Sequence, residues 1–251
     1  MAMIPFSAED VSVFSFTGIY EQQDFWRELS DGPEDSRFYD LKELRGTDGY
    51  LSEEAAEILK NMIDEVKGVH FIDSGNTHYM TKLFTDRLRT PFCLVLLDHH
   101  PDMQPPAFGS LLSCGSWLRA ALDENPYLSE VIMLGVDSEL ARGCGADAEE
   151  RVRFLTDPEE LADLLPALPV YLSIDKDVLS PAVLTTNWDQ GQMEEETLFS
   201  AVGLLCGHCG ILGVDVCGEC GRGDADAAGG RLCKQNDDFN AKLLDFLLGH
   251  R

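Results

Sequence analysis

The chain has 251 residues and is 44% hydrophobic, enough to build a sizeable core, which excludes a protein that is disordered throughout. Its formal net charge is −26, from 45 acidic residues against 19 Lys and Arg, and this argues against nucleic acid or an anionic membrane as a partner. No segment approaches the roughly 18 consecutive apolar residues of a membrane span. The first residues lack the pattern of a secretory signal, so we expect a cytoplasmic protein whose cysteines are free thiols.

Six short apolar runs predict strands because they are rich in Val, Ile, Leu and Phe. In chain order they span residues 11–17, 69–73, 92–98, 131–136, 170–175 and 211–216. The runs are continuous and do not alternate with polar residues, which is typical of strands buried on both faces of a parallel sheet.

Segments with helical spacing of apolar residues separate these runs, at residues 52–66, 109–123, 157–165, 194–206 and 237–248. Alternating strands and helices predict an α/β fold, with three α/β/α layers around a mostly parallel central sheet. No linker-like tract divides the chain, so we expect a single domain over residues 1–251. The Gly-rich stretch at 221–231 predicts a surface loop before the last helix.

Acidic and histidine side chains follow three of the predicted strands, where open α/β sheets bind their ligands. Alternate residues of an extended chain share a face. Asp98, His100 and Asp102 should therefore converge after one strand, and Asp175 and Asp177, on either side of Lys176, after another. A histidine follows the turn after residues 69–73. The complete set is His78, Asp98, His100, Asp102, Asp175 and Asp177.

Burying these groups together would be costly without a cation, because unpaired buried charge costs several kcal/mol. A pair of divalent metal ions would resolve this, and carboxylate and imidazole ligands without thiolate suit Mn²⁺. The alternative is a set of separate caps and solvated turns. The D-H-H-P-D segment alone would fit both interpretations equally well. The D-x-D segment at the end of a second predicted strand favours a metal site.

These motifs resemble the arginase/agmatinase (ureohydrolase) family, which carries G-G-x-H, D-x-H-x-D and S-x-D-x-D-x-x-D-P in this order. They correspond here to residues 75–78, 98–102 and 173–181. The resemblance implies an arginase-like fold and two Mn²⁺ ions per chain, and it is compatible with a homo-oligomer. It also implies that Asp98 and Asp175 bridge the two ions. His78 and Asp102 would then complete one ion's shell, and His100 and Asp177 the other's.

The sequence departs from the family where substrate is held. The family's S-G-N-x-H-G becomes Ser113-Cys114-Gly115-Ser116-Trp117, without a histidine, and its late D-x-x-E ends here on Gly218. Asn76 and Ser180 replace a Gly and an Asp of the motifs. We therefore expect Ser116, Cys114 or a water to donate the proton, Asp102 to hold the nucleophile and Glu219 to take the place of the late Glu. Trp117 is either a pocket wall or a core residue.

The predicted activity is hydrolysis of a C–N bond in a small guanidino, amidino or amide compound other than arginine. One alternative is a metal-binding arginase-like protein without activity. Another is an amide deacetylase of related fold, although such enzymes use one zinc ion and two complete Asp pairs favour two metals.

Two C-x-x-C pairs, Cys206/Cys209 and Cys217/Cys220, resemble zinc knuckles, and the first also resembles a redox motif. A six-residue strand between them would hold the pairs roughly 20 Å apart, too far to share one zinc ion. We therefore expect buried or rim thiols.

Overall fold

The computed structural model describes residues 6–29, 37–63, 65–107, 109, 111–146, 149–223 and 230–249. Two predictions concern residues outside these ranges. One is the lack of a secretory signal at the start of the chain, and the other is the surface loop at residues 224–229 of the Gly-rich stretch. Eight strands form a central sheet in the order β2-β1-β4-β10-β9-β5-β7-β8. Every pairing in it is parallel. This confirms the predicted α/β class, and one central sheet is compatible with a single domain.

The strands of this sheet are β1 (Val11–Ser15), β2 (Phe38–Asp40), β4 (Val69–Phe71), β5 (Phe92–Leu97), β7 (Leu128–Leu134), β8 (Val152–Leu155), β9 (Val170–Asp175) and β10 (Ile211–Cys217). All six predicted runs are strands. The two that were missed, β2 and β8, are the sheet's edges, where polar residues interrupt the apolar pattern. A separate antiparallel pair joins β3 (Tyr50–Leu51) to β6 (Leu112–Ser113).

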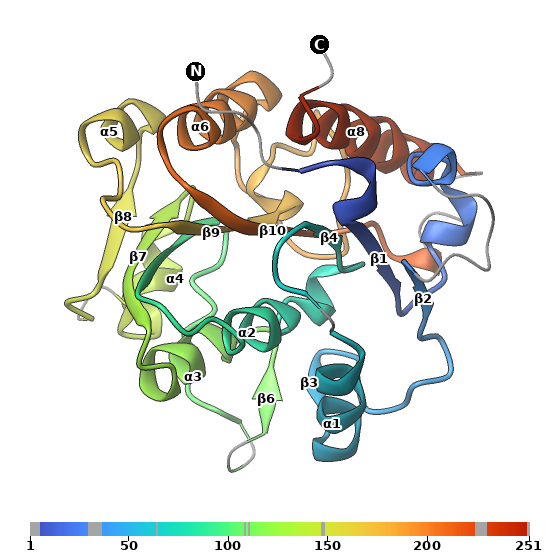
Figure 1. Cartoon of the computed structure of the whole chain (residues 1–251), viewed down its shortest axis with the longest axis horizontal. Coiled ribbons are helices and arrows are strands. Elements are labelled where there is room, and N and C mark those ends of the chain that lie inside the picture. The colour runs from blue at the N-terminus through green and yellow to red at the C-terminus, as the bar shows by residue number, and fades with distance from the viewer. Residues whose placement is uncertain are drawn as a thin grey trace.

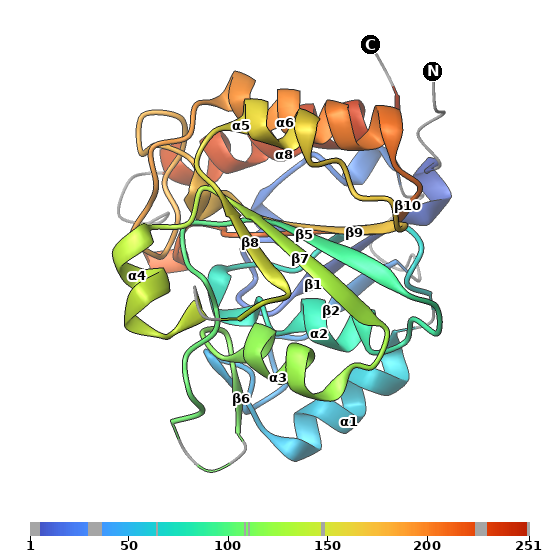
Figure 2. The same ribbon diagram turned by 90° about the vertical axis from the view of Figure 1, so that its left-hand side faces the viewer.

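Helices cover both faces of the sheet, as Figures 1 and 2 show. On one face lie α5 (Pro158–Asp163), α6 (Glu195–His208) and α8 (Arg231–Leu247). On the other lie α1 (Glu53–Met62), α2 (Met80–Thr85) and α3 (Trp117–Glu124), and α4 (Ser138–Gly143) follows β7. Each face therefore has its own apolar core, represented by Leu198 and Leu243 on one side and Leu59 and Phe84 on the other.

Local signals explain where the helices begin. The side chain of Ser52 accepts from Ala55 N at 3.2 Å at the start of α1, and Asp157 with Glu160 forms a capping box before α5. Two predicted starts were wrong. Helix α3 begins at Trp117 instead of residue 109 because β6 occupies part of that segment, and α8 begins at Arg231, six residues before the predicted 237.

The centre of the sheet positions the site. Strands β4, β10, β9 and β5 are neighbours and parallel, so their carboxyl ends meet at one edge. Cys217 pairs in register with Asp175, and Leu97 pairs with Ile174. Among the described residues, no helix combines the length and apolar character needed to cross a membrane.

Candidate metal centre

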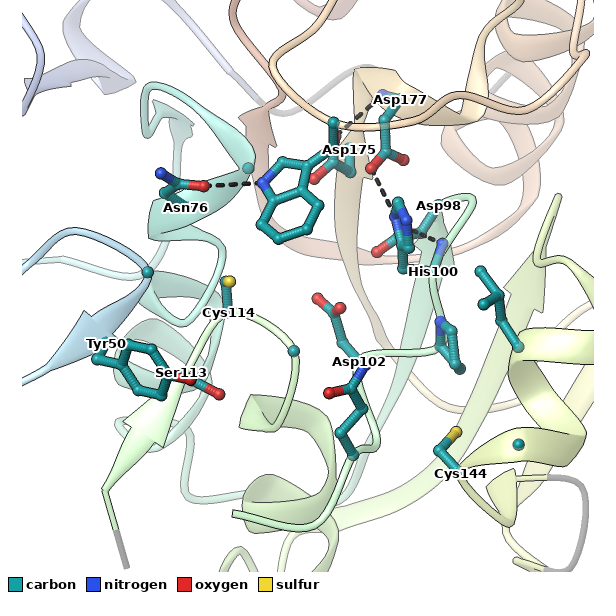
Figure 3. A pocket seen from close by; sticks show the side chains of 18 of the residues that line it. Tyr50, Asn76, Asp98, His100, Asp102, Ser113, Cys114, Cys144, Asp175 and Asp177 are labelled. Carbon is teal, nitrogen blue, oxygen red and sulfur yellow. Dashed lines mark hydrogen bonds and ion pairs between the residues drawn. The ribbon is translucent and has the colours of Figure 1, made fainter. Parts of the chain in front are cut away.

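The structure brings the six predicted ligands together at this edge of the sheet. Asp98 and Asp175 lie at the ends of β5 and β9, and His78 lies between β4 and α2. Figure 3 shows four of the carboxylates and His100 turned toward a common space. Five of the six side chains are buried, and His100 alone is partly exposed.

One group of ligand atoms surrounds His78. Its Nδ1 lies 3.0 Å from Asp102 Oδ2, 3.4 Å from Asp98 Oδ2 and 3.5 Å from Asp175 Oδ2. These distances are those of carboxylates and an imidazole that face one small volume. His78, Asp98 and Asp102 form a possible metal-binding group.

A second group surrounds His100. Its Nδ1 lies 2.8 Å from Asp177 Oδ2 and 3.8 Å from Asp98 Oδ1, and the three residues form another possible metal-binding group. Asp98 belongs to both groups, with one oxygen toward each histidine. A shared carboxylate between two His-containing groups is the arrangement that the family resemblance implies for a bridging ligand.

The electrostatics of the two groups fit divalent cations. Burial, together with the charges of Asp177, Asp102 and Asp175, raises the pKa of Asp98 well above its usual value. Burial and Asp177 raise the pKa of Asp175 to about 6. Burial alone would lower the pKa of both histidines, but the hydrogen bonds and charges of the facing carboxylates raise each to about 9.

The protein alone therefore holds extra protons in this cluster, and cations would replace them. Asp98 Oδ2 is buried and has no hydrogen-bond donor among the described residues, which leaves a lone pair directed into the site. The donor set is carboxylate and imidazole. The residues present thus fit a pair of divalent ions.

Further side chains fix the orientation of the candidate ligands. His78 Nε2 lies 2.9 Å from Ser173 Oγ, which itself donates to Asp215 at 2.7 Å. Trp117 Nε1 donates to Asp102 Oδ2 at 2.6 Å, and its ring is fully buried beside His78. Such partners set the tautomer and direction of a metal-binding side chain. Trp117 is thus a core residue that orients the candidate ligand Asp102, and it does not line the cavity.

Cys217 is a residue that the sequence analysis did not place here. Its thiol donates to Asp175 Oδ2 at 3.1 Å, and it forms a possible metal-binding group with His78 and Asp175. We had assigned it to a C-x-x-C pair. The signal that could have found it is its position at the end of β10, in register with Asp175.

A cavity of about 800 Å³ opens above the two groups. Besides four ligand carboxylates, its described lining includes Asp48 and Glu139 but no Lys or Arg. Tyr50, Leu140 and Trp188 give it apolar walls, and Cys114 also lines it. Burial and the charge of Asp102 raise the pKa of Cys114 to about 12, so its thiol is protonated at neutral pH. The cavity favours a small cationic compound.

Two predicted catalytic residues do not face this cavity. Ser116 Oγ is turned back toward Ser113, where it accepts from the backbone N–H at 3.1 Å and contacts Ser113 Oγ at 2.8 Å. Its hydroxyl is therefore occupied in the turn that precedes α3 and does not line the cavity, so the geometry gives its predicted role as proton donor no support.

Glu219 lies in the loop that follows β10, where it is fully buried and does not line the cavity. Its carboxylate pairs with Lys176 and accepts from Gln23 at 2.6 Å and from Asn240 at 2.7 Å. Both of its oxygens thus already have protein partners. Gly218, at the position of the family's late Glu, has φ +87°, and a Cβ there would collide with Asp175 Oδ1. With Asp175 and the Lys176 backbone placed as they are in this chain, a side chain at that position would be strained and would clash.

The cysteine pairs are buried thiols, as expected. Cys206, Cys209, Cys217 and Cys220 are free and buried, and β10 runs between the two pairs. Burial raises the pKa of Cys206 to about 11, which makes its thiol a poor nucleophile.

Known structures share this architecture. The chain superposes on proclavaminate amidino hydrolase from Streptomyces clavuligerus with a TM-score of 0.64 and 20% identity, covering 100% of this chain and 97% of that one. For the agmatine ureohydrolase of Thermoplasma volcanium the TM-score is 0.65 with 14% identity, covering 100% and 94%. Formimidoylglutamase from Bacillus subtilis gives 0.59 with 18% identity, covering 77% and 65%. The chain therefore has the ureohydrolase fold, and its resemblance to the arginase/agmatinase family is confirmed in structure.

A Thermotoga maritima protein described as uncharacterized is 31% identical over 210 residues, which cover 83% of this chain and 79% of that protein. The two chains belong to one family. No protein-family model matches the sequence.

Proposed function

We propose that this protein is a metal-dependent hydrolase that cleaves a C–N bond of a small cationic guanidino or amidino compound without a carboxylate. The observation that carries the proposal is the pair of Asp- and His-containing groups at the floor of an acidic cavity. The fold supports it, since proteins with this fold include an amidino hydrolase and a ureohydrolase.

His78, Asp98, Asp102 and Asp175 would hold one ion and His100 and Asp177, with the shared Asp98 and Asp175, the other. Two Mn²⁺ ions are the expected pair, and when bound they would supply Lewis acidity and a water of lowered pKa. Asp102 lines the cavity and is held by Trp117, so it can accept a hydrogen bond from an attacking water. Cys114 and solvent remain as proton donors for the leaving amine, because Ser116 is turned away.

The lining explains the choice of substrate class. Asp48 and Glu139 lie beside the ligands, and the described wall offers no cation to pair with a substrate carboxylate. Arginine carries such a carboxylate and is therefore a poor candidate, whereas amidines and guanidines with neutral or cationic tails fit the charge of the cavity.

The test is release of urea, ammonia or amine by Mn²⁺-loaded protein from a panel of guanidino, amidino and amide compounds. Asp98→Ala/Asp175→Ala should be inactive, and Glu139→Gln, which removes a wall carboxylate, should raise KM for cations and leave metal content unchanged. Turnover of amides alone would favour the deacetylase alternative.

A non-catalytic metal-binding protein is the second candidate, and a specific observation favours it. Neither Ser116 nor Glu219, the residues expected to replace the family's shuttle and substrate-holding groups, faces the cavity. Stoichiometric metal uptake with no product from any compound in the panel would support this candidate and reject the hydrolase.

A further inference from the structure

Trp188 is the one of the three tryptophans that is exposed to solvent, and no packing contact among the described residues accounts for its exposure. It lines the cavity and is 44% exposed, whereas Trp26 and Trp117 are 6% and 0% exposed. A large aromatic side chain left open to solvent inside a cavity is a frequent sign of a ligand-binding surface.

The ring is nevertheless held in place. Its Nε1 donates to Asn76 Oδ1 at 2.8 Å, an interaction drawn in Figure 3, and its carbonyl oxygen accepts from Thr186 at 3.0 Å. Asn76 is fixed in turn, since it donates to Asp48 at 2.6 Å and accepts from Asn187 at 3.0 Å. A side chain fixed in this way loses little conformational entropy when a ligand contacts it.

Gly75 makes room for the ring and places it next to the candidate ligands. A Cβ on Gly75 would lie 2.7 Å from Trp188 Cδ1 and 3.2 Å from Asp175 Oδ2. The Trp188 ring also meets the His100 ring at a centroid distance of 5.9 Å and an interplanar angle of 68°. The indole is therefore a wall directly beside the metal-binding groups.

We propose that Trp188 is the binding platform for the planar cation of the substrate, which stacks as an amidinium or guanidinium on the indole. The proposal rests on the proposed function for the reaction, but the binding itself does not require turnover. Indole is the best cation–π partner among the side chains, and planar guanidinium-type cations stack well on it. Asp48 adds a negative charge on the same side, through Asn76. Trp188 thus takes over the role that the resemblance gives to the late Glu, at whose position Gly218 leaves no space.

The test compares benzamidine, an aromatic amidinium, with benzamide, its neutral analogue, on the full Mn²⁺-loaded chain. Calorimetry should show benzamidine binding roughly 3- to 30-fold more tightly than benzamide, the range of one cation–π contact. Trp188→Ala should remove this preference and Trp188→Phe should retain part of it. Trp26→Phe, the matched control at a buried tryptophan, should leave binding unchanged. Benzamidine should also quench the wild-type tryptophan fluorescence saturably and should not quench that of Trp188→Phe.

A second variant tests the anchoring. Asn76→Gly removes the hydrogen-bond acceptor of the indole, so benzamidine affinity should fall severalfold although the tryptophan remains. Folding of each variant is checked by circular dichroism and metal content.

Absence of benzamidine binding, equal affinity for benzamide, or Trp188→Ala binding within twofold of wild type would each overturn the proposal. Trp188-dependent binding without turnover of any amidine would support the platform and reject the hydrolase. Turnover of an amidine that does not depend on Trp188 would support the hydrolase and reject the platform.

Discussion

At the scale of single residues, the candidate site is a cluster in which protons and metal ions compete for the same atoms. The raised pKa values of Asp98 and Asp175 and the facing histidines describe a pocket that binds protons when it lacks cations. Metal affinity should therefore depend on these residues and not on the other acids of the cavity.

We expect Asp98→Ala/Asp175→Ala to abolish metal uptake measured by elemental analysis, because both candidate bridging carboxylates are lost. Asp48→Asn is the matched control: it removes a carboxylate from the same cavity but not from either ligand group, so it should keep the wild-type metal content. Equal metal content in the double variant and the control would refute the ligand assignment.

Trp117 should influence metal affinity without touching a metal. Trp117→Phe keeps an aromatic ring but removes the 2.6 Å hydrogen bond to Asp102, so chelator competition should show metal affinity roughly 10- to 100-fold weaker. Trp26→Phe removes a comparable hydrogen bond, to the Tyr20 carbonyl oxygen, from a buried indole far along the chain. Its metal affinity should be unchanged, and an equal loss in both variants would point to general destabilisation.

The sequence was sufficient to predict which six side chains lie together because strand alternation decides which side chains share a face. Ser116 and Glu219 escaped such reasoning because their directions depend on turns, the first folded back on Ser113 and the second placed beyond Gly218. Cys217 and Trp188 were missed for another reason. Each reaches the site from a distant segment of the chain, and local patterns carry no information on which segments become neighbours.

At the scale of elements, a buried ion pair joins the segment after β9 to the loop after β10, and hydrogen bonds of the same lysine reach helix α8. Lys176 lies between two candidate ligands in sequence, and its Nζ pairs with Glu219 and donates to Asn236 at 2.8 Å and Asn240 at 3.0 Å. Strand alternation places Lys176 on the face opposite to Asp175 and Asp177, but no local pattern indicates partners sixty residues further on.

Lys176→Met should lower the free energy of unfolding by about 3–5 kcal/mol, because it leaves the fully buried Glu219 carboxylate unpaired. Urea denaturation measures the loss. Lys176→Met/Glu219→Leu removes both charges and should recover much of the stability. A double variant as unstable as the single one would show that the pair stabilises through packing instead of charge.

His70 links β4 to β1 and provides a pH-dependent contribution to stability. It is buried, stacks on Phe84 at a centroid distance of 4.4 Å, and lies 2.6 Å from Ser12 Oγ and 3.1 Å from the Val66 carbonyl oxygen. Burial, only partly opposed by the Val66 contact, lowers its pKa to about 4. The folded protein therefore holds a neutral imidazole where the unfolded chain, with a pKa of about 6.5, takes up a proton.

The unfolded state binds more protons between pH 6.5 and 4, so this contribution is complete above pH 6.5 and is lost as the pH falls toward 4. The stability difference between wild type and His70→Gln should shrink by roughly 3 kcal/mol between pH 7 and 4. Because other groups titrate in both proteins, urea unfolding of the two is compared at each pH. A difference that stays constant would mean that the pKa of His70 is the same in the folded and unfolded states.

The accuracy of the secondary-structure prediction also belongs to this scale. The six central strands were predictable because both faces are buried, which forces continuous apolar runs. Edge strands β2 and β8 bury less and carry polar residues such as Arg153, and the short helices α2 and α4 span only six residues each. Pattern alone could not distinguish these elements from loops.

At the scale of the whole molecule, the net charge of the chain and the charge of the candidate site should affect stability at different ion concentrations. The formal net charge of −26 is spread over the surface, and its self-repulsion opposes the compact state. Added salt screens such repulsion, with a Debye length of about 10 Å at 0.1 M. A metal ion at the site acts by mass action at far lower concentration.

We therefore expect the Tm to rise as NaCl increases from about 20 to 300 mM, in wild type and in Asp98→Ala/Asp175→Ala alike, because screening acts on the whole surface. Micromolar Mn²⁺ at constant NaCl should raise the Tm of wild type only, since the double variant lacks the candidate bridging ligands. Differential scanning calorimetry of the two proteins in both titrations separates the effects. A Tm that falls with NaCl would show that surface ion pairs stabilise the fold more than the net charge destabilises it. A Mn²⁺ response in the double variant would show that the ion binds elsewhere on the acidic surface.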